Sequence, residues 1–185
     1  MPVQLSSVYQ DALALAIELH GNQTRKGSDI PYISHLLAVS ATVLEYGGTE
    51  EEAIAALLHD AVEDAGGAEI KKRIADQFGD NVARIVEACS DDSQPLGHTK
   101  RPWRIRKNHH IEQLRKAPSS VLLITAADKL HNARSLMSDY RQLGDAVWDR
   151  FNAEPEDILW YYRTVMEALD KGDVRAHKAD GDDPP

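Results

Sequence analysis

The sequence has little cysteine, no long apolar run and no signal-like start. Its 185 residues contain a single cysteine, Cys89, so no internal disulfide can form. Nowhere do about eighteen apolar residues follow one another, which argues against a transmembrane helix. The first residues, MPVQLSSVYQ, lack the charged start and apolar segment of a secretory signal peptide. We therefore expect a cytoplasmic protein without a membrane partner.

The chain also lacks positive charge, since its formal net charge is −9. Proteins that bind nucleic acid neutralise many phosphates with lysine and arginine, so we expect no nucleic-acid partner. The basic residues are unevenly placed, however, because residues 100–107 contain five of them and no acid. This basic stretch, residues 100–107, suits a small polyanionic ligand, although it could also be one solvated helix face.

No stretch alternates between apolar and polar residues over a useful length, and no internal repeat is found. Apolar residues instead recur at helical spacing along most of the chain. Helices are predicted, in order, over residues 5–20, 34–46, 50–65, 68–78, 81–91, 102–116, 119–137 and 155–169. The sequence thus predicts an all-α, single-domain helical bundle over residues 1–171. Residues 172–185 are polar and rich in Asp, Gly and Pro, and we expect them to form a disordered tail.

Two of these helices have recognisable starts. Ser34 can cap the helix that follows it, and Thr49 with Glu52 forms the pattern of a capping box. The helix after Thr49 contains AIAALLHDAVED and is predicted to run without a break to Gly66. Cys89 lies in the apolar stretch IVEAC, where it is expected to pack as a small hydrophobic residue.

Metal-binding side chains lie at or within apolar helical segments at four positions: His35, His59, Asp60 and Asp128. Polar groups in such places are costly unless they have partners, and a divalent cation would satisfy all of them. Any one of them alone is more often a hydrogen-bonded core residue or a cap. Together they suit six-coordinate Mn²⁺, Fe²⁺ or Mg²⁺ better than a closed structural zinc site, which usually uses cysteine. Such a metal can polarise a phosphoryl oxygen and activate water.

Two carboxylates, Glu63 and Asp64, follow the His-Asp pair in the run HDAVED. On a continuous helix, Glu63 would project from the same face as His59, one turn earlier. A carboxylate just beyond a metal ligand can orient or deprotonate the attacking water. The pattern therefore predicts a hydrolase in which Glu63 and Asp64 are catalytic.

Three stretches, RKGSDIPYISHLLAVS, AALLHDAVED and AADKLHNAR, together resemble the motifs of the Rel/Spo hydrolase domain. The resemblance spans about residues 9–140. It implies an HD-type bundle that uses Mn²⁺, or another divalent metal, to remove pyrophosphate from the 3′ position of ppGpp or pppGpp. It also implies the small, hydrolase-only form, because the chain ends before the family's synthetase and regulatory domains would begin.

The resemblance assigns roles to particular positions. The predicted metal ligands and the Glu63–Asp64 pair match the family's ligands and its water-handling pair. Arg25 matches an arginine that lies against the guanine ring, as a guanidinium plane can. Lys26 and Asn132 match residues that face the nucleotide. The basic stretch lies where hydrolase-only members of the family have phosphate-contacting side chains. Its candidates for this role are Lys100, Arg104, Arg106 and Lys107.

The sequence departs from the family pattern at two places. Long bifunctional members commonly have threonine-lysine where this chain has Ser90-Asp91-Asp92, which favours the small form. A proline often follows the motif histidine, but here Leu36 follows it, which should alter only the helix start.

Other interpretations stay open. The chain could be an HD hydrolase acting on another nucleotide, such as a nucleoside monophosphate, a deoxynucleotide or NADPH. It could also be a catalytically silent nucleotide-binding sensor, although the intact Glu63–Asp64 pair argues against this. Arg25 and Lys26 could be a solvated loop pair, and Asn132 could form only a helix-surface hydrogen bond. Nothing in the sequence indicates the oligomeric state.

Overall fold

The computed structural model describes residues 3–90 and 101–171, and these residues are helical apart from their connections. Within them the sole β-type pairing is an isolated bridge between Thr24 and Pro31. The elements are α1 (Ser7–His20), α2 (Ile33–Glu45), α3 (Glu50–Leu57), α4 (Ala61–Ala65), α5 (Gly67–Phe78), α6 (Asp80–Cys89), α7 (Trp103–Leu114), α8 (Ser119–Leu143), the 3₁₀ helix η1 (Gly144–Arg150) and α9 (Pro155–Lys171). The all-α prediction is confirmed, and the predicted tail, residues 172–185, lies outside the described residues.

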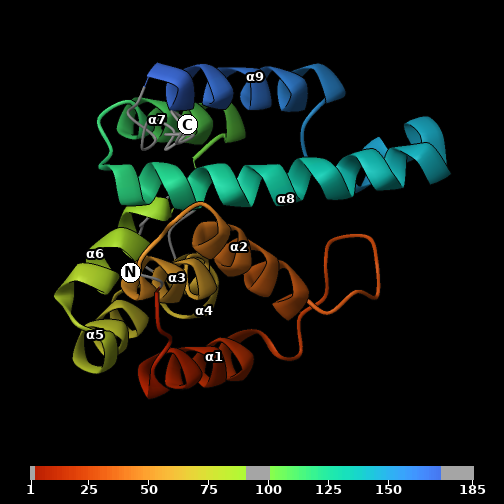
Figure 1. The fold of residues 1–185 in the computed structure, drawn as a ribbon. Helices are drawn as coiled ribbons and strands as arrows, with labels where there is room; N and C mark the ends of the chain where they lie inside the picture. The colour runs from red at the N-terminus through yellow and green to blue at the C-terminus, as the bar shows by residue number, and fades with distance from the viewer. Residues whose placement is uncertain (1–2, 91–100, 172–185) are drawn as a thin grey trace, which may run out of the picture.

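Helix α8 runs across the centre of the molecule, with α7 and α9 on one side and α2, α3, α5 and α6 on the other (Figure 1). Its first turns are apolar on all sides, as is typical of a helix buried between two layers. Leu123 and Ile124 pack in the main core with α1–α6. Leu122 packs in a second cluster with Ile111 of α7 and Tyr161 of α9. Any polar residue that follows on α8 is therefore placed between the two layers.

The predicted helix after Thr49 is broken, which corrects the sequence interpretation. Its capping box is present, since the Glu52 backbone N–H donates to Thr49 Oγ1 at 3.2 Å and the Thr49 N–H donates to Glu52 Oε2 at 2.7 Å. The helix ends at Leu57, and a turn over residues 58–60 separates it from α4. In this turn the Ala61 N–H donates to the carbonyl of Leu58, an i+3 bond tighter than α-helical pairing.

The start of α2 also differs from the prediction. Ser34 lies inside the helix, and its hydroxyl donates to the Pro31 carbonyl at 2.8 Å instead of capping. The N-cap position is Tyr32, which makes no side-chain cap. Cys89 packs partly buried against the main core, as predicted, and burial raises the pKa of its thiol. In the part of the chain that the structure describes, no helix is long and apolar enough to cross a membrane.

Candidate active site

The predicted metal ligands come together from three separate segments. His35 lies near the start of α2, His59 and Asp60 lie in the turn between α3 and α4, and Asp128 lies on α8. His35 Nε2 is 3.2 Å from Asp128 Oδ1. His59 Nε2 is 3.0 Å from Asp60 Oδ2 and 3.9 Å from Asp128 Oδ1. The turn that breaks the predicted helix is thus what aims His59 and Asp60 at α8.

The geometry of His59 fits a metal ligand. Its Nδ1 lies 2.9 Å from the carbonyl of Ala56, which can accept only if Nδ1 carries the proton. The lone pair of the neutral ring then lies on Nε2, toward the two carboxylates. Within the described residues, Nε2 is a buried atom with no hydrogen bond of acceptable geometry, although Asp60 is close. A cation at this point would satisfy it.

The cluster as a whole also suits a divalent cation. One ligand atom each from His35, His59 and Asp128 can lie within 4.8 Å of one another, and all three residues are buried. Asp60 adds a second carboxylate beside His59. Two imidazole nitrogens and two carboxylates leave coordination positions for water and substrate in a six-coordinate ion. These residues therefore fit a catalytic divalent metal.

The charges of the cluster favour ionised carboxylates and a proton on His59. Burial lowers the pKa of His35, which keeps its ring neutral. Burial also acts to lower the pKa of His59, but the carboxylates of Asp60 and Asp128 outweigh it and raise that pKa to about 9. Burial acts to raise the pKa values of both aspartates, and the neighbouring cations hold them below the ordinary value. In the absence of metal, a proton on His59 offsets the negative charge.

This arrangement predicts a pH dependence of metal binding. Because the pKa of His59 is raised to about 9, its proton must leave before a metal can bind at neutral pH. We expect the apparent Mn²⁺ affinity to rise about tenfold for each pH unit between roughly pH 6 and pH 8. Titration calorimetry in buffers of different ionisation enthalpy should show release of about one proton per metal at pH 7. A pH-independent affinity would contradict the assignment of His59 as a ligand.

The predicted catalytic pair lies on the short helix α4, just after the turn. Glu63 is partly buried and Asp64 is exposed. The Asp64 N–H donates to the Asp60 carbonyl at 3.0 Å, so α4 is bonded directly to the ligand turn. The predicted reason for the position of Glu63, one continuous helix with His59, is wrong, because the helix breaks between them. Glu63 still lies close to the turn along the chain, because α4 begins at Ala61, directly after it.

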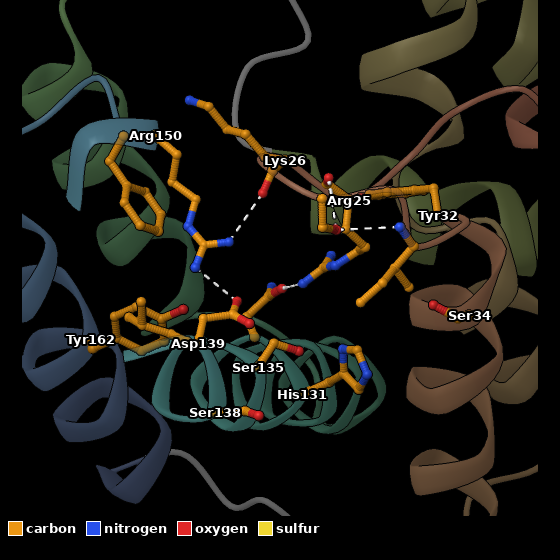
Figure 2. A pocket seen from close by; sticks show the side chains of 15 residues that line it. Arg25, Lys26, Tyr32, Ser34, His131, Ser135, Ser138, Asp139, Arg150 and Tyr162 are labelled. Carbon is orange, nitrogen blue, oxygen red and sulfur yellow. Dashed lines mark hydrogen bonds and ion pairs between the residues drawn. The ribbon is translucent and has the colours of Figure 1, made fainter. Parts of the chain in front are cut away.

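Figure 2 shows the side chains that line a cavity of about 470 Å³, one of which, Asn132, is bonded to the predicted metal ligand Asp128. Arg25, Lys26 and Asn132 line it, as do His131 and Tyr162. The Arg25 guanidinium donates to Asn132 Oδ1 at 2.5 Å, and the Asn132 amide donates in turn to Asp128 Oδ1. Arg25 and Asn132, two of the predicted nucleotide contacts, are therefore joined to a predicted metal ligand by hydrogen bonds.

The loop that carries Arg25 and Lys26 is held against α8 by η1. Arg150 of η1 donates to the Lys26 carbonyl at 3.2 Å and pairs with Asp139 of α8 at 2.7 Å (Figure 2). The Arg25 guanidinium also lies 5.7 Å from the ring centroid of Tyr32. The loop backbone is thus held against α8; Arg25 is partly buried, and the side chain of Lys26 is exposed.

Two neighbours of the ligands, Tyr32 and Lys129, have no predicted role in the sequence. The Tyr32 hydroxyl donates to Asp60 Oδ2 at 2.5 Å, and Lys129 Nζ lies 2.7 Å from Asp128 Oδ2. Both are inside the motif stretches, but a tyrosine or a lysine there has no distinctive spacing. Burial acts to lower the pKa of Lys129, and Asp128 outweighs it and raises that pKa well above the ordinary value. Tyr32 therefore holds the Asp60 oxygen that faces His59, and Lys129 holds the Asp128 oxygen that does not face His35.

The basic stretch divides between two environments. Arg104 pairs with Asp157 of α9, and its guanidinium lies 3.2 Å from the ring centroid of Trp160. Arg106 Nε donates to the Arg101 carbonyl at 3.2 Å. Lys107 is instead partly buried, with its Nζ 4.7 Å from the ring centroid of Tyr161, and its charge interacts with Glu63 and Asp128. Burial and neighbouring Lys129 lower its pKa to about 8, against these carboxylates. Lys100 lies outside the described residues.

In this helical bundle, histidine and aspartate side chains from α2, α8 and the α3–α4 turn meet at one point. Such a set of side chains is typical of helical proteins that bind a divalent metal. A family model described as HD domain matches residues 12–159, and the chain belongs to this family. More particularly, it is similar to guanosine-3′,5′-bis(diphosphate) 3′-pyrophosphohydrolase MESH1 of Xenopus tropicalis, with 36% identity over 129 residues, 68% of each chain. A solved structure of a metazoan ortholog of SpoT that hydrolyzes ppGpp matches with a TM-score of 0.72 and 26% identity, covering 90% of this chain and 88% of that one.

Longer relatives match as well. The chain is 37% identical to a probable GTP pyrophosphokinase of Mycobacterium leprae over 131 residues, 70% of this chain. It spans only 16% to 18% of the length of that protein and of its relatives from rice and Haemophilus influenzae. The resemblance to the Rel/Spo hydrolase domain is confirmed by these relatives.

Proposed function

We propose that this chain is a divalent-metal-dependent hydrolase that removes pyrophosphate from the 3′ position of ppGpp or pppGpp. The observation that carries the proposal is the hydrogen-bonded connection from Arg25 through Asn132 to Asp128. It places a cavity of nucleotide size directly beside the predicted metal ligands. The names of the relatives, including the Xenopus enzyme of similar length, support the same substrate.

The proposed mechanism divides the work between the ligands and α4. His35, His59, Asp60 and Asp128 would hold the metal, which when bound supplies Lewis acidity to a phosphoryl oxygen and lowers the pKa of water. Glu63 accepts a proton from the attacking water, and Asp64 helps to orient that water. The water oxygen forms a bond to the phosphorus on the 3′ oxygen, and the bond from that phosphorus to the ribose oxygen breaks. The ribose oxygen takes up a proton, which gives GDP or GTP and pyrophosphate.

Binding of the remaining substrate groups falls to the cavity and α7. Arg25 presents a guanidinium plane on which guanine can stack, and Lys26 and Asn132 contact the nucleotide from the same wall. Lys107 supplies the cation next to the cluster for a phosphate oxygen, because a buried phosphate needs a paired charge. Manganese is the proposed metal, since the mixed nitrogen and oxygen set suits it.

Product analysis tests this proposal directly. The purified protein would be incubated with ppGpp and, in parallel, Mn²⁺, Mg²⁺ or no metal. GDP and pyrophosphate in equal amounts, formed only with a divalent metal, are expected. Other nucleotides, including NADPH, a deoxynucleotide and a nucleoside monophosphate, would be run beside it. Faster hydrolysis of one of these nucleotides would identify it, instead of ppGpp, as the substrate. Tight ppGpp binding without turnover would identify the protein as a sensor. The expected cytoplasmic location stays a prediction that cell fractionation would check.

The two environments of the basic stretch give a matched pair of variants. Lys107→Met keeps an unbranched stem but removes the charge that faces the cluster. Losing a hydrogen bond to a charged group costs about 1.5–3 kcal/mol, so we expect KM for ppGpp to rise roughly 10- to 150-fold. Arg104→Gln is the control, because Arg104 is already paired with Asp157. This substitution should change KM by about twofold or less. Steady-state kinetics would be measured for both variants. A larger increase in KM in Arg104→Gln than in Lys107→Met would contradict the prediction.

A further inference from the structure

His131 lies on α8 between the predicted metal ligands and the cavity. It follows Asp128 by about one helical turn, and its ring centroid is 4.8 Å from that of His35. It also lines the cavity, where its ring lies between α8 and α2 (Figure 2). One imidazole therefore contacts both a predicted ligand and the predicted substrate space.

The hydrogen bond between the two rings can carry only one proton. His35 Nδ1 and His131 Nδ1 are 2.8 Å apart, so one of them must donate and the other accept. His35 Nε2 points toward Asp128 Oδ1 at 3.2 Å and must offer its lone pair to bind a metal. The proton of a neutral His35 then lies on Nδ1, which makes His131 Nδ1 the acceptor. A neutral His131 consequently carries its own proton on Nε2.

We propose that His131 is a positioning residue that fixes His35 in its metal-binding tautomer and donates from Nε2 to an acceptor of the ligand in the cavity. The other predicted ligands have comparable supports. His59 is held by the Ala56 carbonyl, Asp60 by Tyr32 and Asp128 by Lys129. His131 gives His35 the matching support, and it does so from the cavity wall. The second half of the proposal rests on the proposed nucleotide hydrolysis, whereas the first half concerns metal binding alone.

Two substitutions distinguish the roles of the two ring nitrogens of His131. In His131→Asn, the amide oxygen can take the place of Nδ1 as acceptor, but no group replaces Nε2–H. In His131→Leu, both are lost and the buried N–H of His35 has no acceptor. Loss of such an outer partner typically weakens metal binding by 10- to 100-fold. We expect the Mn²⁺ dissociation constant to rise about 10- to 100-fold in His131→Leu and to stay within about threefold of wild type in His131→Asn. The KM for ppGpp should rise in both, by about fivefold or more.

The control is His109→Leu, which removes an exposed histidine of α7 and should change neither constant. Circular dichroism would establish that each variant is folded. Equal metal affinity in His131→Leu and wild type, or equal weakening in both His131 variants, would overturn the positioning role. If the wild-type protein binds Mn²⁺ but does not hydrolyse ppGpp, the proposed function fails while the metal-affinity comparison still decides the role of His131.

A spectroscopic measurement on the unaltered protein needs no variant. Nitrogen-15 NMR of labelled histidine in the protein saturated with diamagnetic Zn²⁺ reports which ring nitrogen carries the proton. We expect His35 to carry it on Nδ1 and His131 on Nε2. A proton on His131 Nδ1 in the metal-loaded protein would reverse the direction of the hydrogen bond and overturn the proposal.

Discussion

The His59→Ala variant should lose its divalent metal and, with it, measurable hydrolysis of ppGpp. His59 is 4% exposed, and its Nε2 lies between the carboxylates of Asp60 and Asp128. Without this nitrogen a bound cation would lose one of its four predicted protein ligands. Metal ions contribute several kcal/mol to stabilising charge in such reactions, so kcat should fall about 10³-fold or more. Metal content after dialysis and single-turnover rates with ppGpp would both be measured.

Removal of a buried histidine can also destabilise the fold, because it leaves two carboxylates close together. His59→Gln therefore accompanies the alanine variant, since it retains a polar side chain of similar size. Thermal unfolding without metal should show both variants folded, while added Mn²⁺ should raise the Tm of wild type alone. Full metal content and full rate in His59→Ala would show that His59 is not a ligand and would contradict the predicted metal site.

Glu63→Gln should also cause a large loss of activity. Unlike His59→Ala, it should leave metal binding intact. The substitution keeps the shape of the side chain but removes its basicity. Glu63 lies on α4, just beyond the ligand turn, where it can take a proton from the attacking water. We expect Mn²⁺ affinity within about threefold of wild type and a kcat lower by about 10²-fold or more, the usual scale for a positioned acid or base. Calorimetry and steady-state kinetics on the same sample would separate the two quantities.

The matched control is Glu69→Gln, an exposed glutamate on α5 that should leave kcat unchanged. Asp64→Asn tests the partner position, because Asp64 is exposed and Glu63 is partly buried. A smaller loss in Asp64→Asn than in Glu63→Gln is expected for an orienting residue. An unchanged kcat in Glu63→Gln, with a large loss in Asp64→Asn, would transfer the role of general base to Asp64.

The position of the helices and the identity of the ligand residues could be predicted from the sequence. Apolar spacing indicated each long helix, and the capping box at Thr49 and Glu52 is present as predicted. The ligand residues could be recognised because a histidine or aspartate in an apolar segment needs a partner. Asp128 is the plainest example, since it directly follows the buried α8 segment that contains Leu123 and Ile124.

Local breaks were harder to predict because the chain around His59 favours a helix. The run AIAALLHDAVED contains no proline or glycine, and its spacing gives no reason to stop at Leu57. The turn over residues 58–60 is compatible with the core because its first residue, Leu58, and the residue just after it, Ala61, are fully buried. Whether a segment of high helix propensity forms a turn is thus decided by how its side chains pack in the core. A local sequence pattern does not contain that information.

Sequence by itself determined the all-α class, the likeness to Rel/Spo hydrolases and the residue types that can hold a metal, because each depends on periodicity or on chemistry along the chain. Only the tertiary structure decided which cations of the basic stretch are buried. Lys107 is partly buried, whereas Arg104 is exposed and held by Asp157 and Trp160 of α9. It also decided that His131 meets His35, 96 residues away. Such contacts depend on how α2, α7 and α9 pack against α8, and a hydrogen bond between distant residues has no signal in the spacing of either one.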